Sequence, residues 1–241
     1  MKKKFTCYNP VLLITIFIFG FLFSAKIFPQ SGGLNLLVAL PQGEFMDNVG
    51  RAGVGLSGQF TFFSPQPDAP FTFGINLGYI NYGYESRRVP FNQWAPDVPV
   101  DVNRLNNLVN FHFLFQVLPF EGSVKPYLDI LFGGNYIFTT TEIKSDNEQI
   151  ASTTNFDDFG WSYGGGGGLL IRLTDFEQSE ERMSPSSLWL DLKFRYLYGT
   201  EAEYLKEGSV DIHNDGTVTY YYSKSKIDLI TIHLGVVVEF F

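Results

Sequence analysis

The chain has 241 residues, of which 24 are glycine, 25 phenylalanine and 13 tyrosine, and only 17% are charged. Such an abundance of glycine and aromatic residues is unusual for a soluble enzyme of this length. The formal net charge is −8, which disfavours nucleic acid as a partner because nucleic acids are bound by basic surfaces.

Residues 1–30 have the order of a secretory signal peptide. Three lysines open the segment, an apolar run follows at 11–23, and small residues close it. The run is shorter than the roughly 20 residues of a membrane-spanning helix, so we expect cleavage rather than an anchor. Removing the segment takes away four lysines and no acid, which leaves 13 basic and 25 acidic residues and a net charge of −12. Cys7, the only cysteine, leaves with it, so we expect no disulfide and no thiolate site in residues 31–241.

Eight later segments alternate apolar and polar residues with a period of two, the pattern of a strand that is apolar on one face. They lie at about 33–40, 51–63, 71–84, 104–118, 126–142, 158–173, from 188 onward, and 227–241. No later stretch has 15 uninterrupted apolar residues. Any membrane insertion is therefore expected to use strands.

The connections between these segments alternate in length. We expect 64–70, 119–125 and the longer, acidic 174–187 to face the periplasm, and 41–50, 85–103, 143–157 and 205–226 to lie outside the cell. Trp94 lies among prolines in the second outer loop, which predicts either a stiff aromatic contact site or an ordinary surface loop.

A tight-turn signal lies in the last outer loop. His213 to Gly216 reads His-Asn-Asp-Gly between apolar and aromatic flanks, which predicts that the last two strands continue as a ribbon beyond the membrane. Another chain could add a strand to its edge at Tyr220, Tyr221 and Tyr222. The alternative is a hairpin that only closes the barrel.

The polar faces indicate which way the apolar faces point. They carry charges of both signs on several strands, which is expected of a narrow lumen filled by paired side chains, whereas aromatic residues near the strand ends suit interfacial girdles. The glycines at 164–168 are expected to allow tight curvature and to leave room for long side chains from the opposite wall. The predicted lumen set is Arg51, Asp129, Arg172, Asp191, Lys193, Arg195, His233 and Glu239.

With these features the chain resembles the small outer-membrane β-barrel family, which includes outer membrane protein X and the membrane domain of outer membrane protein A. The resemblance covers nearly all of 33–241 and is carried by the FGWSYGGGGGLLIRL, KPYLDILFGG and LGVVVEFF segments. It implies an all-β, eight-stranded antiparallel up-and-down transmembrane barrel, integral to the bacterial outer membrane and in contact with its lipid and lipopolysaccharide. It also implies insertion by the barrel-assembly machinery, which reads the final strand and its terminal aromatic residue. Here Phe240 rather than Phe241 is in phase with the lipid face.

Catalytic and metal sites find little support in the sequence. None of His112, His213 and His233 shows the His-x-Ser spacing that resembles lipid A deacylases, and no two of them have the near spacing of metal ligands. We therefore expect no catalytic, cofactor or metal site, and a non-enzymatic protein with a structural or adhesion-like surface role through its outer loops. The alternatives are an outer-leaflet lipid-modifying enzyme, a narrow pore and a soluble lipocalin-like carrier.

Overall fold

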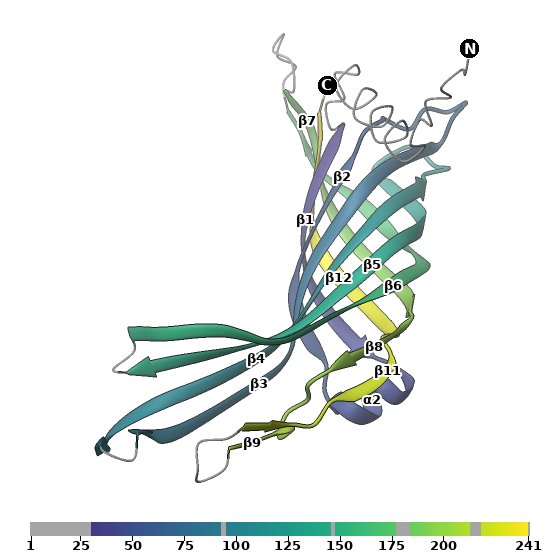
Figure 1. The fold of residues 1–241 in the computed structure, drawn as a ribbon. Helices are drawn as coiled ribbons and strands as arrows, with labels where there is room; N and C mark the ends of the chain where they lie inside the picture. The colour runs from purple at the N-terminus through teal and green to yellow at the C-terminus, as the bar shows by residue number, and fades with distance from the viewer. Residues whose placement is uncertain (1–29, 93–94, 146–147, 177–183, 213–217, 241) are drawn as a thin grey trace, which may run out of the picture.

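The computed structural model describes residues 30–92, 95–145, 148–176, 184–212 and 218–240, and the predicted signal peptide lies outside them. Eight antiparallel strands close into a barrel in the order β1-β12-β7-β6-β5-β4-β3-β2 (Figure 1). The expected eight-stranded up-and-down barrel is confirmed. Its strands are β1 (Ser31–Pro41), β2 (Gly53–Thr61), β3 (Phe71–Asn92), β4 (Ala95–Val117), β5 (Val124–Ser145), β6 (Glu148–Asp175), β7 (Pro185–Gly199) and β12 (Leu229–Phe240). No helix in the described part of the chain is long and apolar enough to span a membrane.

Closure depends on the first and last strands. β1 pairs with β12 from Ser31↔Glu239 to Pro41↔Leu229, and its other edge pairs with β2. A period of two then sends successive side chains to opposite faces of the closed wall. In β1, Leu34 is 62% exposed and the next residue, Asn35, is 1% exposed.

The outside of the barrel is apolar, and the inside is partly polar. This arrangement is opposite to that of a water-soluble carrier, in which the apolar face would line the interior. Aromatic residues form one girdle around Phe71, Phe73 and Phe115 and another around Trp161 and Tyr163. A closed barrel with an apolar belt between aromatic girdles is the architecture of an integral outer-membrane protein. The outward apolar residues include Leu36, Val54, Leu56, Phe113, Leu128, Ile130, Phe132, Phe194, Ile232 and Leu234.

The interior has three layers along the barrel axis. Inward positions of β7 show the order, because Trp189 is followed by Asp191, Lys193 and Arg195 and then by Leu197. Trp189 belongs to an apolar cluster at the end of the short turns, and Leu197 belongs to a larger cluster toward the other end. Short turns mark the periplasmic end of such barrels, so a polar layer lies between two apolar ones.

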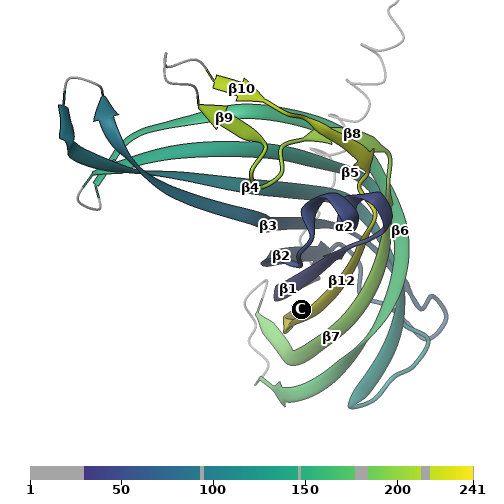
Figure 2. The same ribbon diagram turned by 90° about the horizontal axis from the view of Figure 1, so that it is seen from below.

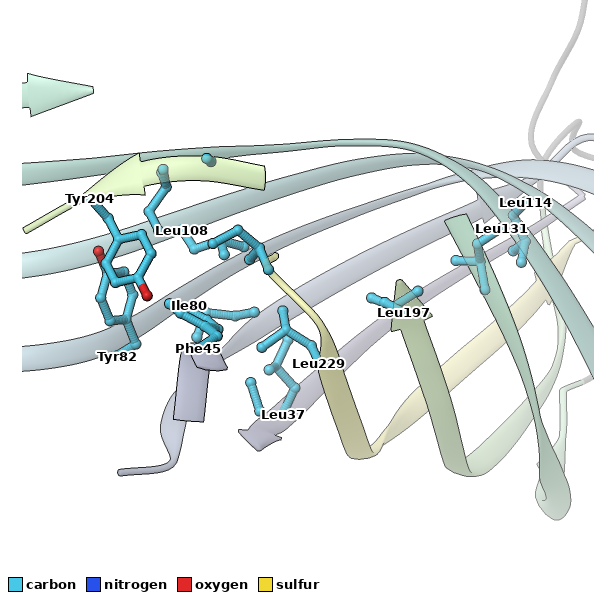
Figure 3. Packing of buried hydrophobic residues seen from close by; sticks show 14 residues of the cluster. Leu37, Phe45, Ile80, Tyr82, Leu108, Leu114, Leu131, Leu197, Tyr204 and Leu229 are labelled. Atoms are coloured by element: carbon cyan, nitrogen blue, oxygen red, sulfur yellow. The ribbon is translucent and has the colours of Figure 1, made fainter. Parts of the chain in front are cut away.

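The extracellular apolar cluster is completed by the helix α2 (Gly43–Val49), which the sequence analysis took for part of a loop. The helix lies across the mouth of the barrel (Figure 2). Its Phe45 is fully buried and packs edge-on against Tyr82 at 5.7 Å and Tyr204 at 5.0 Å between ring centroids (Figure 3). Gly50 ends the helix in the left-handed conformation, with φ of 70°, and its N–H bonds the carbonyl of Met46.

We expect Phe45→Ala to lower the free energy of unfolding by about 3 kcal/mol, since truncating a buried phenylalanine removes apolar burial and leaves a cavity. Met46, the next residue, is 40% exposed, so Met46→Ala is the matched control and should change stability by less than about 0.5 kcal/mol. Urea unfolding in lipid vesicles, followed by tryptophan fluorescence, measures both. Equal losses would show that α2 does not seal the mouth.

The prediction that two segments are outer loops is wrong. Residues 85–103 and 143–157 mostly continue β3 to β6 as two long hairpins, with pairs as far as Asn92↔Ala95 and Ser145↔Glu148. β4 and β5 also stay paired as far as Asp101↔Lys144. Residues 83–92, 95–105, 140–145 and 148–156 therefore form one four-stranded sheet beyond the barrel, the projecting sheet, which leaves the barrel sideways (Figures 1 and 2).

The predicted ribbon of the last two strands is only partly present. β7 ends at Gly199, whose N–H donates to the carboxylate of Asp228 at 2.8 Å. Two short pairs follow, β8 (Glu201–Tyr204) with β11 (Ser223–Lys226), and β9 (Val210–Ile212) with β10 (Val218–Tyr220). The turn signal at 213–216 lies outside the described residues.

Candidate functional site

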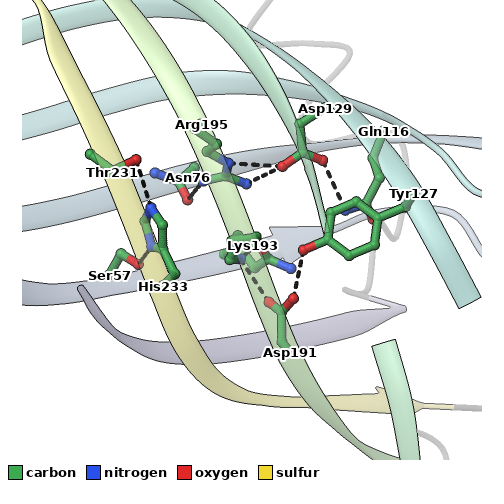
Figure 4. Close-up of polar contacts among 11 residues, drawn as sticks. Ser57, Asn76, Gln116, Tyr127, Asp129, Asp191, Lys193, Arg195, Thr231 and His233 are labelled. Carbon is green, nitrogen blue, oxygen red and sulfur yellow. Dashed lines mark hydrogen bonds and ion pairs between the residues drawn. The ribbon is translucent and has the colours of Figure 1, made fainter. Parts of the chain in front are cut away.

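An ion pair lies at the centre of the polar layer. Arg195 donates from Nε at 2.8 Å and from Nη2 at 2.5 Å to Oδ2 of Asp129, and from Nη1 at 2.8 Å to Oδ1 of Asn76 (Figure 4). Gln116 donates to the other oxygen of Asp129 at 3.0 Å. The side chains of Arg195 and Asp129 are at most 1% exposed. The pair is thus removed from water and bonded on several sides.

A second ion pair lies beside it. Nζ of Lys193 lies 2.7 Å from Oδ2 of Asp191 and donates to Oε1 of Gln59 at 2.5 Å. The hydroxyl of Tyr127 donates to Oδ1 of Asp191 at 2.5 Å. Two cations and two anions therefore neutralise one another in the lumen. Because buried charges depend on such partners, this geometry stabilises a filled interior and supports the interpretation of these residues as a plug.

A serine and a histidine also meet in the polar layer, so the enzyme alternative needs a geometric check. Oγ of Ser57 lies 3.0 Å from Nδ1 of His233, and Nε2 of the same ring lies 2.9 Å from the hydroxyl of Thr231. A Ser-His-acid triad has a carboxylate at that third position. Here it is a threonine, and all three side chains are at most 4% exposed. The arrangement is that of a buried hydrogen-bonded histidine.

Three predicted lumen residues lie elsewhere. Arg51 is half exposed and pairs with Glu207 at 2.8 Å on the extracellular side, because β2 begins only at Gly53 and its phase does not extend back to Arg51. Arg172 and Glu239 are in the inward phase but lie at the periplasmic rim, where both remain partly exposed.

The periplasmic rim holds a hollow of about 500 Å³ lined by the first two turns, Lys125, Arg172 and Glu239. Lys125 lies 4.0 Å and Arg172 4.9 Å from the ring centroid of Trp189. Lys125 pairs with Glu239 at 3.1 Å, and Arg172 pairs with Asp175 at 3.4 Å. Lys125 and Arg172 are thus each already paired with an acid.

The projecting sheet has two faces, and the register of its strands determines which residues lie on each. The barrel-exterior face continues the lipid-facing surface and includes Tyr84, Ser86, Asn103, Glu142, Lys144 and Ser152. The barrel-interior face continues the lumen side and includes Glu85, Arg87, Val102, Arg104, Ile143, Thr153 and Phe156.

Residues 205–210 and 219–222, called here the covering segment, pack on the barrel-interior face. Oε1 of Glu207 accepts the backbone N–H of Tyr84 at 2.9 Å, and Oε2 of Glu85 accepts the N–H of Gly208 at 3.2 Å. Arg104 donates to the same oxygen of Glu85 at 3.2 Å. The buried Leu205 lies in the same segment.

The predicted tyrosine contacts lie at the surface of the covering segment. Tyr221 is 55% and Tyr222 is 50% exposed. The ring of Tyr222 also packs on Phe156 of β6 at 4.7 Å and stacks on Tyr220 at 6.4 Å. These two ring contacts hold the side chain of Tyr222 in a fixed position at the surface. Trp94 lies outside the described residues.

Several partners of the buried charges were left out of the predicted lumen set. Gln59 and Gln116 lie on the polar faces that the period of two indicates, and Asn76 alternates with outward apolar residues in the same way, so this signal could have added all three. Tyr127 lies two residues before Asp129 on β5 and therefore shares its inward face. Its aromatic ring makes it resemble an interfacial residue, and only the contact with Asp191 identifies it as part of the network.

The predicted assembly signal is only partly described. The backbone N–H of Phe240 donates to the carbonyl of Gln30 at 2.8 Å, and the register of β12 shifts between Glu239 and Phe240. Phe241 lies outside the described residues. Within the described part of the chain, no three His, Cys, Asp or Glu side chains are placed to hold a metal ion.

Comparisons with known proteins find likeness in structure only. No protein-family model matches the sequence, and no curated protein matches it. Neisserial surface protein A is similar in structure, with 13% identity, a TM-score of 0.37, and coverage of 87% of this chain and 96% of that one. A major outer membrane protein from Thermus thermophilus has 11% identity, a TM-score of 0.36, and coverage of 86% and 98%. Ail, the attachment invasion locus protein of Yersinia pestis, solved with a heparin analogue, has 11% identity, a TM-score of 0.31, and coverage of 86% and 94%. Scores at this level carry no argument about function, and the assignment of the fold rests on the strand pairing above.

Proposed function

We propose that this integral outer-membrane barrel is a non-enzymatic surface-interaction protein, and that the covering segment with the barrel-interior face of the projecting sheet binds a partner outside the cell. The observation that carries the proposal is the projecting sheet itself. Its hairpins continue well beyond the last pairing of β3 with β2, at Val54↔Asn81, and about ten further residues extend a strand by about 33 Å. A barrel that served only as a membrane plug would not need this sheet.

The filled lumen supports a surface role. Neutralised charges occupy its middle, and apolar clusters close both ends, with Phe45 at one and Trp189 at the other. A barrel of eight strands is just wide enough for its own side chains. Transport is therefore a weaker proposal than contact at the surface.

The surface also has suitable chemistry. Tyrosine supplies a large apolar ring with a polar tip at little entropic cost, and it is enriched at protein interfaces. Tyr221 and Tyr222 are half exposed, and Tyr222 is held by Phe156. Lipopolysaccharide and the barrel-assembly machinery are further partners that a protein of this architecture would meet.

The test uses the full chain displayed on a bacterial host that lacks its own adhesins. Cells are applied to wells coated with collagen, fibronectin or laminin and to epithelial monolayers, and bound cells are counted. We expect display to raise adherence to at least one surface, and Tyr221→Ser with Tyr222→Ser to lower it at least fivefold, because the aromatic contact area is lost.

The matched control is Phe120→Ser, which removes an equally exposed aromatic residue, 58% exposed, from a periplasmic turn. It should leave adherence unchanged. Heat modifiability on gels establishes that equal amounts of folded barrel are compared. Adherence equal to that of host cells without the protein, on every surface, would overturn the proposal.

A further inference from the structure

The direction of the projecting sheet places one of its faces toward the membrane. The sheet leaves the extracellular end of the barrel sideways in both views (Figures 1 and 2). The covering segment packs on the barrel-interior face, through Glu85 and Phe156. Figure 2, seen from the extracellular end, shows β9 and β10 in front of the sheet. The barrel-exterior face is therefore turned back over the lipid that surrounds the barrel.

This face is continuous with the lipid-contacting wall. Tyr79, on the wall, is 44% exposed, and Tyr84, on the sheet, is 49% exposed. The hydroxyl of Tyr79 donates to Asn107 at 2.7 Å, and that of Tyr84 donates to Asn103 at 3.1 Å. Amphipathic tyrosines with satisfied hydroxyls are the residues expected where hydrocarbon gives way to headgroups.

From Tyr84 outward the face becomes polar in rows across the strands. The row of Tyr84 also contains Leu105, Thr140 and Thr154, and the next contains Ser86, Asn103, Glu142 and Ser152. The outermost row aligns Arg88, Asp101 and Lys144. Arg88 is the most open of these charges, with 70% of its side chain exposed and 4.0 Å between its Nε and Asp101. Lys144 is paired with Glu142 at 2.9 Å, which leaves Arg88 as the open cation of this row. Hydroxyl and amide groups with an open guanidinium beyond them match a layer of sugars that carries phosphate.

We propose that the barrel-exterior face of the projecting sheet lies on the outer leaflet and binds the sugar and phosphate headgroups of lipopolysaccharide. The established lipid interface of the barrel thus continues over the membrane surface as a headgroup interface. This inference concerns the opposite face from the proposed partner site and stands independently of it.

The test uses a matched pair of neighbouring residues. Ser152 and Thr153 are both exposed, but Ser152 pairs with Glu142 on the barrel-exterior face, and Thr153 pairs with Thr141 on the other. Each is replaced by cysteine in the full chain with Cys7→Ser, and a nitroxide label is attached. Ser86→Cys supplies a second position on the barrel-exterior face.

The labelled proteins are placed in detergent micelles, in phosphatidylcholine nanodiscs and in nanodiscs that also contain lipopolysaccharide. Collision of the label with a water-soluble nickel reagent is measured by electron paramagnetic resonance. We expect lipopolysaccharide to lower the collision rate at least threefold for labels at 152 and 86, and to leave the label at 153 unchanged. Equal rates at 152 and 153 would overturn the overhanging geometry. Equal protection at 152 in both kinds of nanodisc would overturn the assignment of lipopolysaccharide.

Discussion

We expect Arg195→Ala to lower the free energy of unfolding by about 4 kcal/mol, because removing one partner of a buried ion pair leaves the other charge uncompensated. Arg195 donates two bonds to Asp129, which would retain only the amide of Gln116 among its described partners. Asn76 would also lose the guanidinium that it binds. The measurement is urea unfolding in lipid vesicles, together with the temperature at which the heat-modified band shifts on a gel.

A double-variant cycle separates the loss of the pair from the cost of the orphaned charge. Arg195→Met combined with Asp129→Leu should be less destabilising than Arg195→Ala alone, because replacing both charges with apolar residues removes the desolvation penalty. Arg88→Ala serves as a control, since the side chain of Arg88 is exposed and its Nε lies as far as 4.0 Å from the carboxylate of Asp101. For this exposed pair we expect the free energy of unfolding to change by less than about 0.5 kcal/mol. A loss at Arg195 no larger than the loss at Arg88 would refute the role of the pair in holding the lumen together.

Gly166→Ala is expected to abolish the folded, heat-modifiable barrel. A Cβ at Gly166 would lie 2.0 Å from the carbonyl oxygen of Phe194 and 2.7 Å from Cα of Arg195. These atoms belong to the backbone of the paired strand β7, so they cannot move aside as a flexible side chain would. The ladder between β6 and β7 would have to separate at the point where the buried charges lie.

The control for this prediction is another strand glycine in open surroundings. A Cβ at Gly58 would meet only the carbonyl oxygen of Gly33, at 3.8 Å. Gly58→Ala should therefore change stability by less than about 1 kcal/mol. Refolding each variant from urea into vesicles and reading the heat-modified band compares them. A Gly166→Ala barrel as stable as Gly58→Ala would mean that the strands are spaced more widely than described.

The barrel itself could be predicted from the sequence, because a period of two is a local signal. Asp129, Asp191, Lys193, Arg195 and His233 were all placed inside by phase alone, and they are buried there. Their pairing was beyond that signal, since Arg195 and Asp129 lie on different strands and meet only after the barrel closes. The glycine run illustrates the same limit. Its inward members make room for residues of the adjacent strands, such as Tyr127 beside Gly168, rather than for the opposite wall.

The projecting sheet could not be predicted in the same way. Pro90, Pro96 and Pro99 interrupt residues 85–103, and proline within a strand usually argues against one. In the structure Pro90 pairs with Pro99, and β3 is an edge strand there, where a missing N–H matters little. Pairing along the β3–β4 hairpin overrides the local preference. Conversely, the last outer loop has strong strand propensity, but β7 ends at Gly199 and β12 begins only after Asp228. No local pattern reveals the hydrogen bond between Gly199 and Asp228 that accompanies this interruption.

The candidate surface follows from that tertiary arrangement. Tyr221 and Tyr222 could be chosen from the sequence as exposed aromatics, but Phe156, on which Tyr222 rests, lay in a predicted loop. Likewise Arg51 was assigned to the lumen although it pairs with Glu207 outside it.

Because the projecting sheet extends to one side, the molecule is asymmetric in the plane of the membrane. Its footprint at the cell surface exceeds its footprint in the hydrocarbon, and the excess lies on one flank only. Neighbouring proteins can approach closely on the side of the barrel opposite the projecting sheet, whereas the sheet keeps them at a distance on the side toward which it extends (Figures 1 and 2). Arrays of this protein would therefore have a preferred in-plane orientation, set by an overhang rather than by any contact between barrels.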